Sequence, residues 1–178
     1  MPDPTCPERA DLLDVLRKHR ALFRVPVSGV TDEQARERPT VSELTLGGLV
    51  KHVSHTERHW ARFVTDGPAD TPDVDWSSID WSNPPPEVLA FQDGFRMRED
   101  ESLAGLLAAY DEIAAATDAL VLETDLDASQ PLPAAPWFPP GARWTARRVF
   151  LHIAVETAQH AGHADLIRES IDGQKSMG

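Results

Sequence analysis

Four stretches of the chain place apolar residues three and four positions apart, which is the spacing of an amphipathic helix. They cover about residues 8–23, 45–66, 100–122 and 145–171. Thr45 stands at the N-cap of the second stretch, and Gly173 follows the fourth as a C′ residue. No stretch shows strand-type alternation of useful length. The pattern predicts an all-α fold with four long helices.

The segments between the helices are long and irregular in pattern. Residues 67–98 and 124–143 are rich in Pro, Asp, Ser and Trp, which predicts loops that pack on the helices. A capping-box pattern, Thr31 followed by Gln34, predicts one short helical turn. The architecture we expect is an antiparallel four-helix bundle with two long crossover loops, formed as a single domain by residues 1–178.

The charge and composition of the chain bear on whether it binds nucleic acid or membranes. Seventeen Lys and Arg against 29 Asp and Glu give a net charge of -12, and no basic run is present, so we expect no nucleic-acid partner. No apolar stretch approaches the roughly 20 residues of a membrane span, and the N-terminus lacks a secretory pattern. We expect a cytoplasmic protein with no membrane partner. Cys6 is the one cysteine and cannot form an internal disulfide.

Histidines concentrate on the second and fourth helices, which carry six of the seven. At about 100° per residue, four ionisable side chains of the fourth helix fall within about 80° of one another. They are His152, Glu156, His160 and His163. Glu156 and His160 point along the apolar stripe that should face the bundle interior. A carboxylate and an imidazole placed there need a cation, a metal ion or each other.

On the second helix His52 lies nearest to the buried side, with His59 a weaker candidate and His55 the furthest away. His52, Glu156 and His160 would form a His₂Glu set that leaves a fourth position open for water or substrate. The alternative is an ordinary polar pair four residues apart on a less buried helix, with a solvated His52.

The neighbouring histidines are candidates for supporting roles. His163 could be a fifth ligand, a hydrogen-bond partner of a ligand, or a proton shuttle, and we favour the last two. We interpret His152, His55 and His59 as rim or surface residues.

Two motifs resemble the DinB/YfiT-like superfamily of metal-binding four-helix proteins, namely LTLGGLVKHVSHTERHW and ETAQHAGHADLIRESIDG. The likeness is greatest to the actinobacterial mini-circle branch, which is related to the N-terminal domains of mycothiol-dependent maleylpyruvate isomerases. It implies that His52 matches the metal-binding histidine of helix two, and that Glu156 and His160 match the ligand pair of the last helix. Gly162 would allow close helix packing. A homodimer is common in that family.

The isomerases of that family carry a further C-terminal domain that contributes to catalysis, whereas the sequence here ends at Gly178, just after the fourth helix, so we do not expect maleylpyruvate isomerisation itself. The activity we favour is a metal-dependent transferase or isomerase whose metal holds a low-molecular-weight thiol, such as mycothiol, as thiolate. His163 or His59 would move a proton, and Trp137, Phe138 and Trp144 would wall the pocket.

Two alternatives stay open: a hydrolase in which the metal activates water, and a non-catalytic bundle that binds a metal or a ligand. In each enzymatic case the partner is a small-molecule substrate. Zinc is the expected divalent ion, while nickel, cobalt or iron would suit the same ligands.

Overall fold

The computed structural model describes residues 6–68, 79–80, 82–133, 135 and 137–176. Its helices are α1 (Pro7–Arg24), α2 (Asp32–Arg36), α3 (Leu46–Asp66), α4 (Pro86–Asp93), α5 (Leu103–Glu123) and α6 (Ala146–Asp172). Two short strands, β1 (Ser129–Pro131) and β2 (Arg143–Thr145), lie between α5 and α6. The predicted all-α bundle is confirmed, since α1, α3, α5 and α6 correspond to the four amphipathic stretches.

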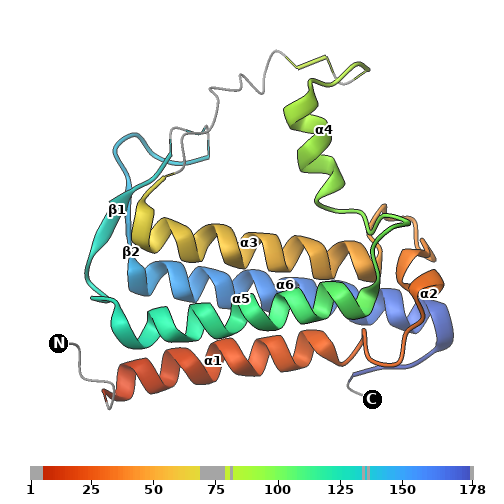
Figure 1. Cartoon of the computed structure of the whole chain (residues 1–178), viewed down its shortest axis with the longest axis horizontal. Helices are drawn as coiled ribbons and strands as arrows, with labels where there is room; N and C mark the ends of the chain where they lie inside the picture. Colours follow the sequence, from red (N-terminus) through yellow and green to blue (C-terminus); the bar gives the residue numbers. More distant parts are fainter. Residues whose placement is uncertain (1–5, 69–78, 81, 134, 136, 177–178) are drawn as a thin grey trace.

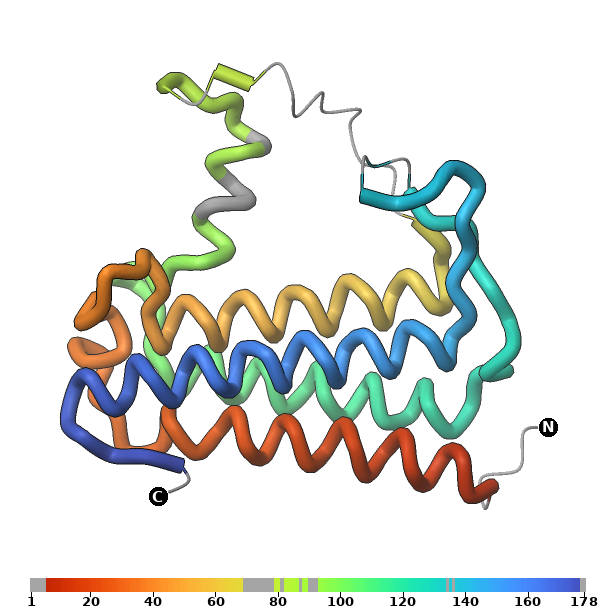
Figure 2. The backbone as a smooth tube through the Cα atoms, turned by 180° about the vertical axis from the view of Figure 1, so that it is seen from behind, coloured from red at the N-terminus to blue at the C-terminus, as the bar shows by residue number. Residues whose placement is uncertain are grey.

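The four long helices pack side by side, as Figures 1 and 2 show from opposite directions. α6 lies between α1 and α3, and α5 contacts α3 and α1. α3 and α6 run in opposite directions, whereas α3 and α5 run in the same direction (Figure 1). Two parallel neighbours cannot be joined by a short turn, so the link from α3 to α5 has to return along the whole bundle.

Local capping residues set the helix ends. The side chains of Thr45, Ser102 and Thr145 each accept a hydrogen bond from the backbone N–H three residues later. Gly173 follows α6 with a φ of 79°, which is the left-handed conformation that favours glycine. The caps predicted at Thr45 and Gly173 are therefore confirmed. α5 begins at Leu103, slightly later than expected, because Ser102 caps it.

The buried apolar side chains form two clusters that follow one another along the bundle. One cluster contains Leu16, Phe63 and Phe150, and the other contains Phe23 and Tyr110. Phe23 and Tyr110 meet edge to face, with ring centroids 6.3 Å apart. Buried polar side chains, Glu57 among them, lie between the two clusters, so the interior is apolar on either side of a polar layer.

The links contain structure that the sequence pattern did not predict. α4 lies within residues 67–98, and β1 pairs antiparallel with β2 in the register Ser129 to Thr145. Three-residue strands are too short to show alternation, which is why they were missed. Residues 69–78 and 81 lie outside the described residues, so the predicted packing of that part of the link is not tested.

Two further observations concern the helix surfaces. A Cβ atom added at Gly162 would meet nothing within 4 Å, so the expectation that this glycine allows close helix packing is wrong. Within the described ranges, none of the helices combines the length and the apolar character that a membrane crossing requires.

Candidate metal centre

His52 of α3 and two side chains of α6, Glu156 and His160, lie together where the two helices pack. Each offers one ligand atom, and these three atoms all lie within 4.8 Å of one another. The rings of His52 and His160 have centroids 4.7 Å apart and are nearly perpendicular. Since α3 and α6 are neighbours, residues more than 100 positions apart in the sequence converge on one point.

The site lies at the edge of the helix interface and not inside the bundle. The side chains of His160 and Glu156 are 12% and 28% exposed. His160 is therefore mostly buried, as the apolar stripe led us to expect, whereas Glu156 is more exposed than expected. The interior at this level of α6 is filled by Ile153, Thr157 and Ala164, which are buried. The site is thus close to the surface, where the carboxylate side chain of Glu156 is partly exposed to solvent.

The donor set fits a small divalent cation. Ligands of a tetrahedral zinc ion, with bonds of about 2.0–2.1 Å, lie about 3.3 Å from one another. Nε2 of His160 lies 3.7 Å from Oε2 of Glu156, so side-chain rotation can bring the atoms to that spacing. Two imidazoles and one carboxylate form a ligand set common in catalytic zinc sites, where a fourth position stays open. The role of these residues as metal ligands stays a prediction.

Burial keeps the imidazoles of the site neutral. Burial, then the nearby His160 and His55, lowers the pKa of His52 to about 4. Burial, and then His163, also lowers the pKa of His160. Neutral imidazole is the form that binds a metal ion, so neither ring must release a proton at neutral pH.

His163 lies one turn beyond His160 on α6 and contacts it directly. The Nδ1 atoms of the two rings are 3.3 Å apart, which is hydrogen-bond distance if one nitrogen carries the proton. This contact leaves Nε2 of His160 directed toward Glu156. The contact from His163 to Nδ1 of His160 fixes the orientation of the His160 ring.

His152 was expected at the rim, and the structure instead places it beside Glu156. Its Nε2 lies 3.7 Å from Oε1 of Glu156, on the opposite carboxylate oxygen from His160. The ring stands edge-on to both Trp60 and Trp144, with centroids 4.9 and 5.0 Å away. The spacing 152, 156, 160 was visible in the sequence, but the two tryptophans that hold the ring were not.

Aromatic side chains border the site on the side of His152. Trp60 stacks on Trp144 at 4.8 Å, and Phe138 meets Trp144 edge to face at 5.6 Å. Trp144 and Phe138 were expected to wall a pocket, and both belong to this border. Trp137 is 64% exposed, and its ring centroid lies 6.2 Å from that of Phe138.

Phe95 covers His52 from the other side. Its ring stacks on the imidazole with centroids 4.2 Å apart. The chain at Phe95 passes so close to α3 that a Cβ atom on Gly48 would lie 2.1 Å from the Phe95 carbonyl oxygen. Gly48 therefore permits the close approach that places Phe95 over His52. No local pattern in the sequence pointed to this contact.

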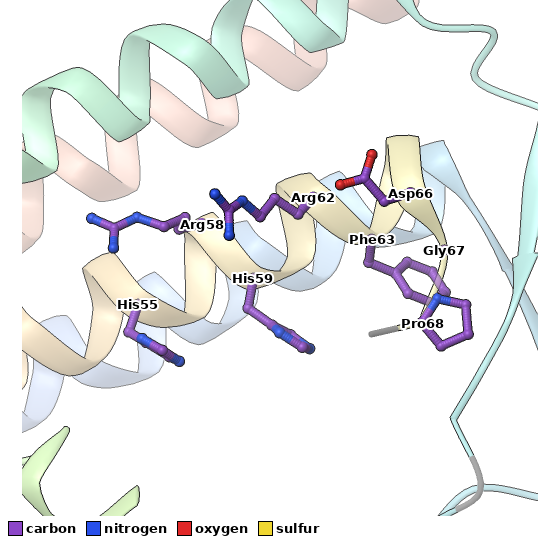
Figure 3. A pocket seen from close by; sticks show the side chains of 8 residues that line it. All are labelled: His55, Arg58, His59, Arg62, Phe63, Asp66, Gly67 and Pro68. Atoms are coloured by element: carbon purple, nitrogen blue, oxygen red, sulfur yellow. The ribbon is translucent and has the colours of Figure 1, made fainter. Parts of the chain in front are cut away.

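His55 and His59 lie outside the ligand group. Both line a groove on the outer face of α3 together with two arginines (Figure 3). Neither histidine belongs to the group of three ligand atoms. This agrees with the helical angles, which place His52 closer to the buried side of the helix than His55 and His59.

Three comparisons with known proteins bear on this chain. A profile of the mycothiol-S-transferase family matches residues 11–173. A solved structure described as a conserved protein from Enterococcus faecalis covers 92% of this chain and 96% of its own, with a TM-score of 0.59 and 14% identity, which shows a shared fold. A comparison with curated proteins found no match. The family profile spans all four long helices, and on that ground the chain belongs to the mycothiol-S-transferase family, within the DinB and mycothiol-enzyme superfamily.

Proposed function

We propose that the protein is a metal-dependent transferase that joins mycothiol, or a closely similar thiol, to a small electrophile. The observation that carries this proposal is the convergence of His52, Glu156 and His160 within 4.8 Å in a chain of the mycothiol-S-transferase family. An isomerase that uses the thiol as a cosubstrate would employ the same site.

The donor set supports a specific chemistry. A divalent ion held by His52, Glu156 and His160 would lower the pKa of a thiol at its open position, so that the sulfur is nucleophilic at neutral pH. No cysteine of the chain lies among these residues, since Cys6 stands before α1, so the thiol must come from the cosubstrate. The sulfur forms a bond to an electrophilic carbon, and the leaving group departs with the electron pair of the broken bond.

Residues around the ligands would orient and supply protons. His163, which lies beside His160, would accept the proton of the thiol and return it to the leaving group. His152, between Glu156 and the stacked Trp60 and Trp144, would hold the carboxylate in place. The aromatic border would exclude water from one side of the substrate.

The test is elemental analysis combined with a turnover assay. Wild-type protein is expected to hold one divalent ion per chain, and His52→Ala and His160→Ala are expected to lose it. His55→Ala, an exposed histidine on the same helix, is the matched control and should retain the metal. Conversion of a chromogenic aryl halide should depend on added mycothiol. Stoichiometric metal in both ligand variants would refute the site.

Two other outcomes would identify a different function. Thiol-independent hydrolysis by the same ligands would make the protein a metal hydrolase. A metal that raises the melting temperature without supporting any turnover would indicate a non-catalytic bundle. Zinc is the ion we propose, because two imidazoles and a carboxylate form a common zinc set, and elemental analysis separates it from nickel, cobalt and iron.

The protein is also proposed to form a homodimer through α6. Leu151, Val155 and Leu166 leave an exposed apolar row on that helix. Light scattering on wild-type protein and on Val155→Glu tests this proposal. A monomeric wild-type protein would refute it.

A further inference from the structure

A groove runs along the outer face of α3, next to the candidate metal centre but separate from it. Its volume is about 250 Å³. Arg58 and Arg62 flank it on one side, His55 and His59 flank it on the other, and Phe63 lies at its end (Figure 3). Sites for whole small molecules have volumes of roughly 300–1,000 Å³, so this groove matches part of a ligand.

The two arginines of the groove differ from most others in the chain. Their guanidinium groups make no hydrogen bond or ion pair with any described residue. Other arginines do, as Arg17 with Asp118, Arg24 with Asp111, and Arg147 with Glu8. In a chain with 29 acidic and 17 basic residues, two neighbouring arginines without a partner among the described residues are a local excess of positive charge. Asp66, which also lines the groove, lies beyond ion-pair distance of Arg62.

The groove and the metal centre are connected through one row of histidines. His52, His55 and His59 stand three and four residues apart, so their side chains follow one another along α3. A ligand held in the groove could therefore extend along α3 toward His52.

We propose that the groove binds the carboxylate of an amphiphilic substrate, whose reactive end reaches the metal centre. Arg58 and Arg62 would hold the carboxylate, since guanidinium groups pair with planar oxyanions through two hydrogen bonds. Pro68, which is exposed and lines the end of the groove, would contact the apolar part next to it. This inference rests on the proposed function and names the class of its electrophile: an organic acid.

The groove is tested with phenylpropionate and its neutral amide, phenylpropionamide, on the full chain. Binding is followed by the NMR shifts of the His55 and His59 ring protons. The acid is expected to bind at least about tenfold more tightly than the amide, as loss of one charged hydrogen-bond partner implies. Equal binding of acid and amide, or no binding of the acid, would overturn the proposal.

Substitution of the two arginines tests whether they cause the preference for the acid over the amide. Arg58→Gln/Arg62→Gln should weaken phenylpropionate binding at least about tenfold and leave amide binding unchanged. Arg96→Gln is the matched control, because Arg96 is exposed and its side chain also lacks a partner among the described residues. If Arg96→Gln weakens binding as much, net charge explains the effect and the groove does not.

Inorganic phosphate distinguishes the source of the oxyanion. Phosphate that binds as tightly as phenylpropionate would assign the groove to a free inorganic ion and overturn its role as a substrate subsite. Weaker binding of phosphate supports that role. Metal content is measured separately. A protein that holds no metal but still prefers the acid to the amide would refute the proposed transferase and support the carboxylate site. A protein that holds metal but binds acid and amide equally would refute the carboxylate site alone.

Discussion

Replacing Glu57 by glutamine removes one charge from a buried network that joins α1, α3 and α5. Glu57 is 1% exposed, and its two carboxylate oxygens accept hydrogen bonds from Nη2 and Nε of Arg20 at 2.6 and 3.2 Å. Nη1 of Arg20 donates to Asp118 at 2.7 Å. Glu57 lies on the face of α3 opposite to the groove. Its ion pair therefore helps to fix the rotation of α3 about its axis, and this rotation directs His52 toward α6.

The expected loss of stability follows from burial and from the contact that remains. Removing one partner of a buried ion pair costs about 3–5 kcal/mol. Asp118 still pairs with Arg20, and the glutamine oxygen still accepts one hydrogen bond, so we expect about 2–3 kcal/mol for Glu57→Gln. In a chain of this size, that loss lowers the melting temperature by about 4–12 °C.

Urea unfolding followed by circular dichroism measures this change as a lower midpoint with an unaltered slope. The control is Asp111→Asn, which breaks the Arg24–Asp111 pair where the aspartate is 68% exposed and should cost under about 1 kcal/mol. The double variant Arg20→Met/Glu57→Leu should be more stable than either single change at these positions, because it removes both charges of the buried pair while Asp118 keeps its ion pair with Arg17. A Glu57→Gln protein as stable as Asp111→Asn would refute the reasoning.

Three further predictions concern the site and its surroundings. Free metal at a thousand times its dissociation constant should raise the free energy of unfolding by about 4 kcal/mol, and a chelator should reverse the gain; no shift in melting temperature would contradict metal binding. The unfolded state takes up a proton on His52 near its ordinary pKa, whereas the folded state does so only near 4. The free energy of unfolding of the metal-free protein should therefore fall by about 1–2 kcal/mol as the pH falls through this range, with solvent screening allowed for. His52→Gln should reduce that loss when stability is measured as a function of pH. Gly48→Ala should lower the urea midpoint because its Cβ atom meets the Phe95 backbone, while Gly162→Ala, in open space, should raise stability by about 0.5–1 kcal/mol; equal effects would show that the Phe95 contact is not tight.

Local patterns in the chain were sufficient to predict the four long helices and several of their ends. Apolar periodicity and capping residues act within a few positions, so Thr45 and Gly173 could be recognised from neighbouring residues alone. The same locality explains why Glu156 and His160 could be paired, since residues four apart always share a helix face. α4 and the two strands escaped prediction because each is too short for a period to show.

The sequence by itself determined the helices and pointed to His52, Glu156 and His160 as candidate metal ligands. Only the tertiary structure decided that α3 packs against α6 and brings His52 to Glu156 and His160, because that pairing depends on the rotation of two helices about their axes. It also placed Phe95 on His52, and Trp60 and Trp144 around His152. These contacts join segments that are distant in the sequence. They are determined by side-chain packing between helices, and such packing leaves no periodic pattern along the chain.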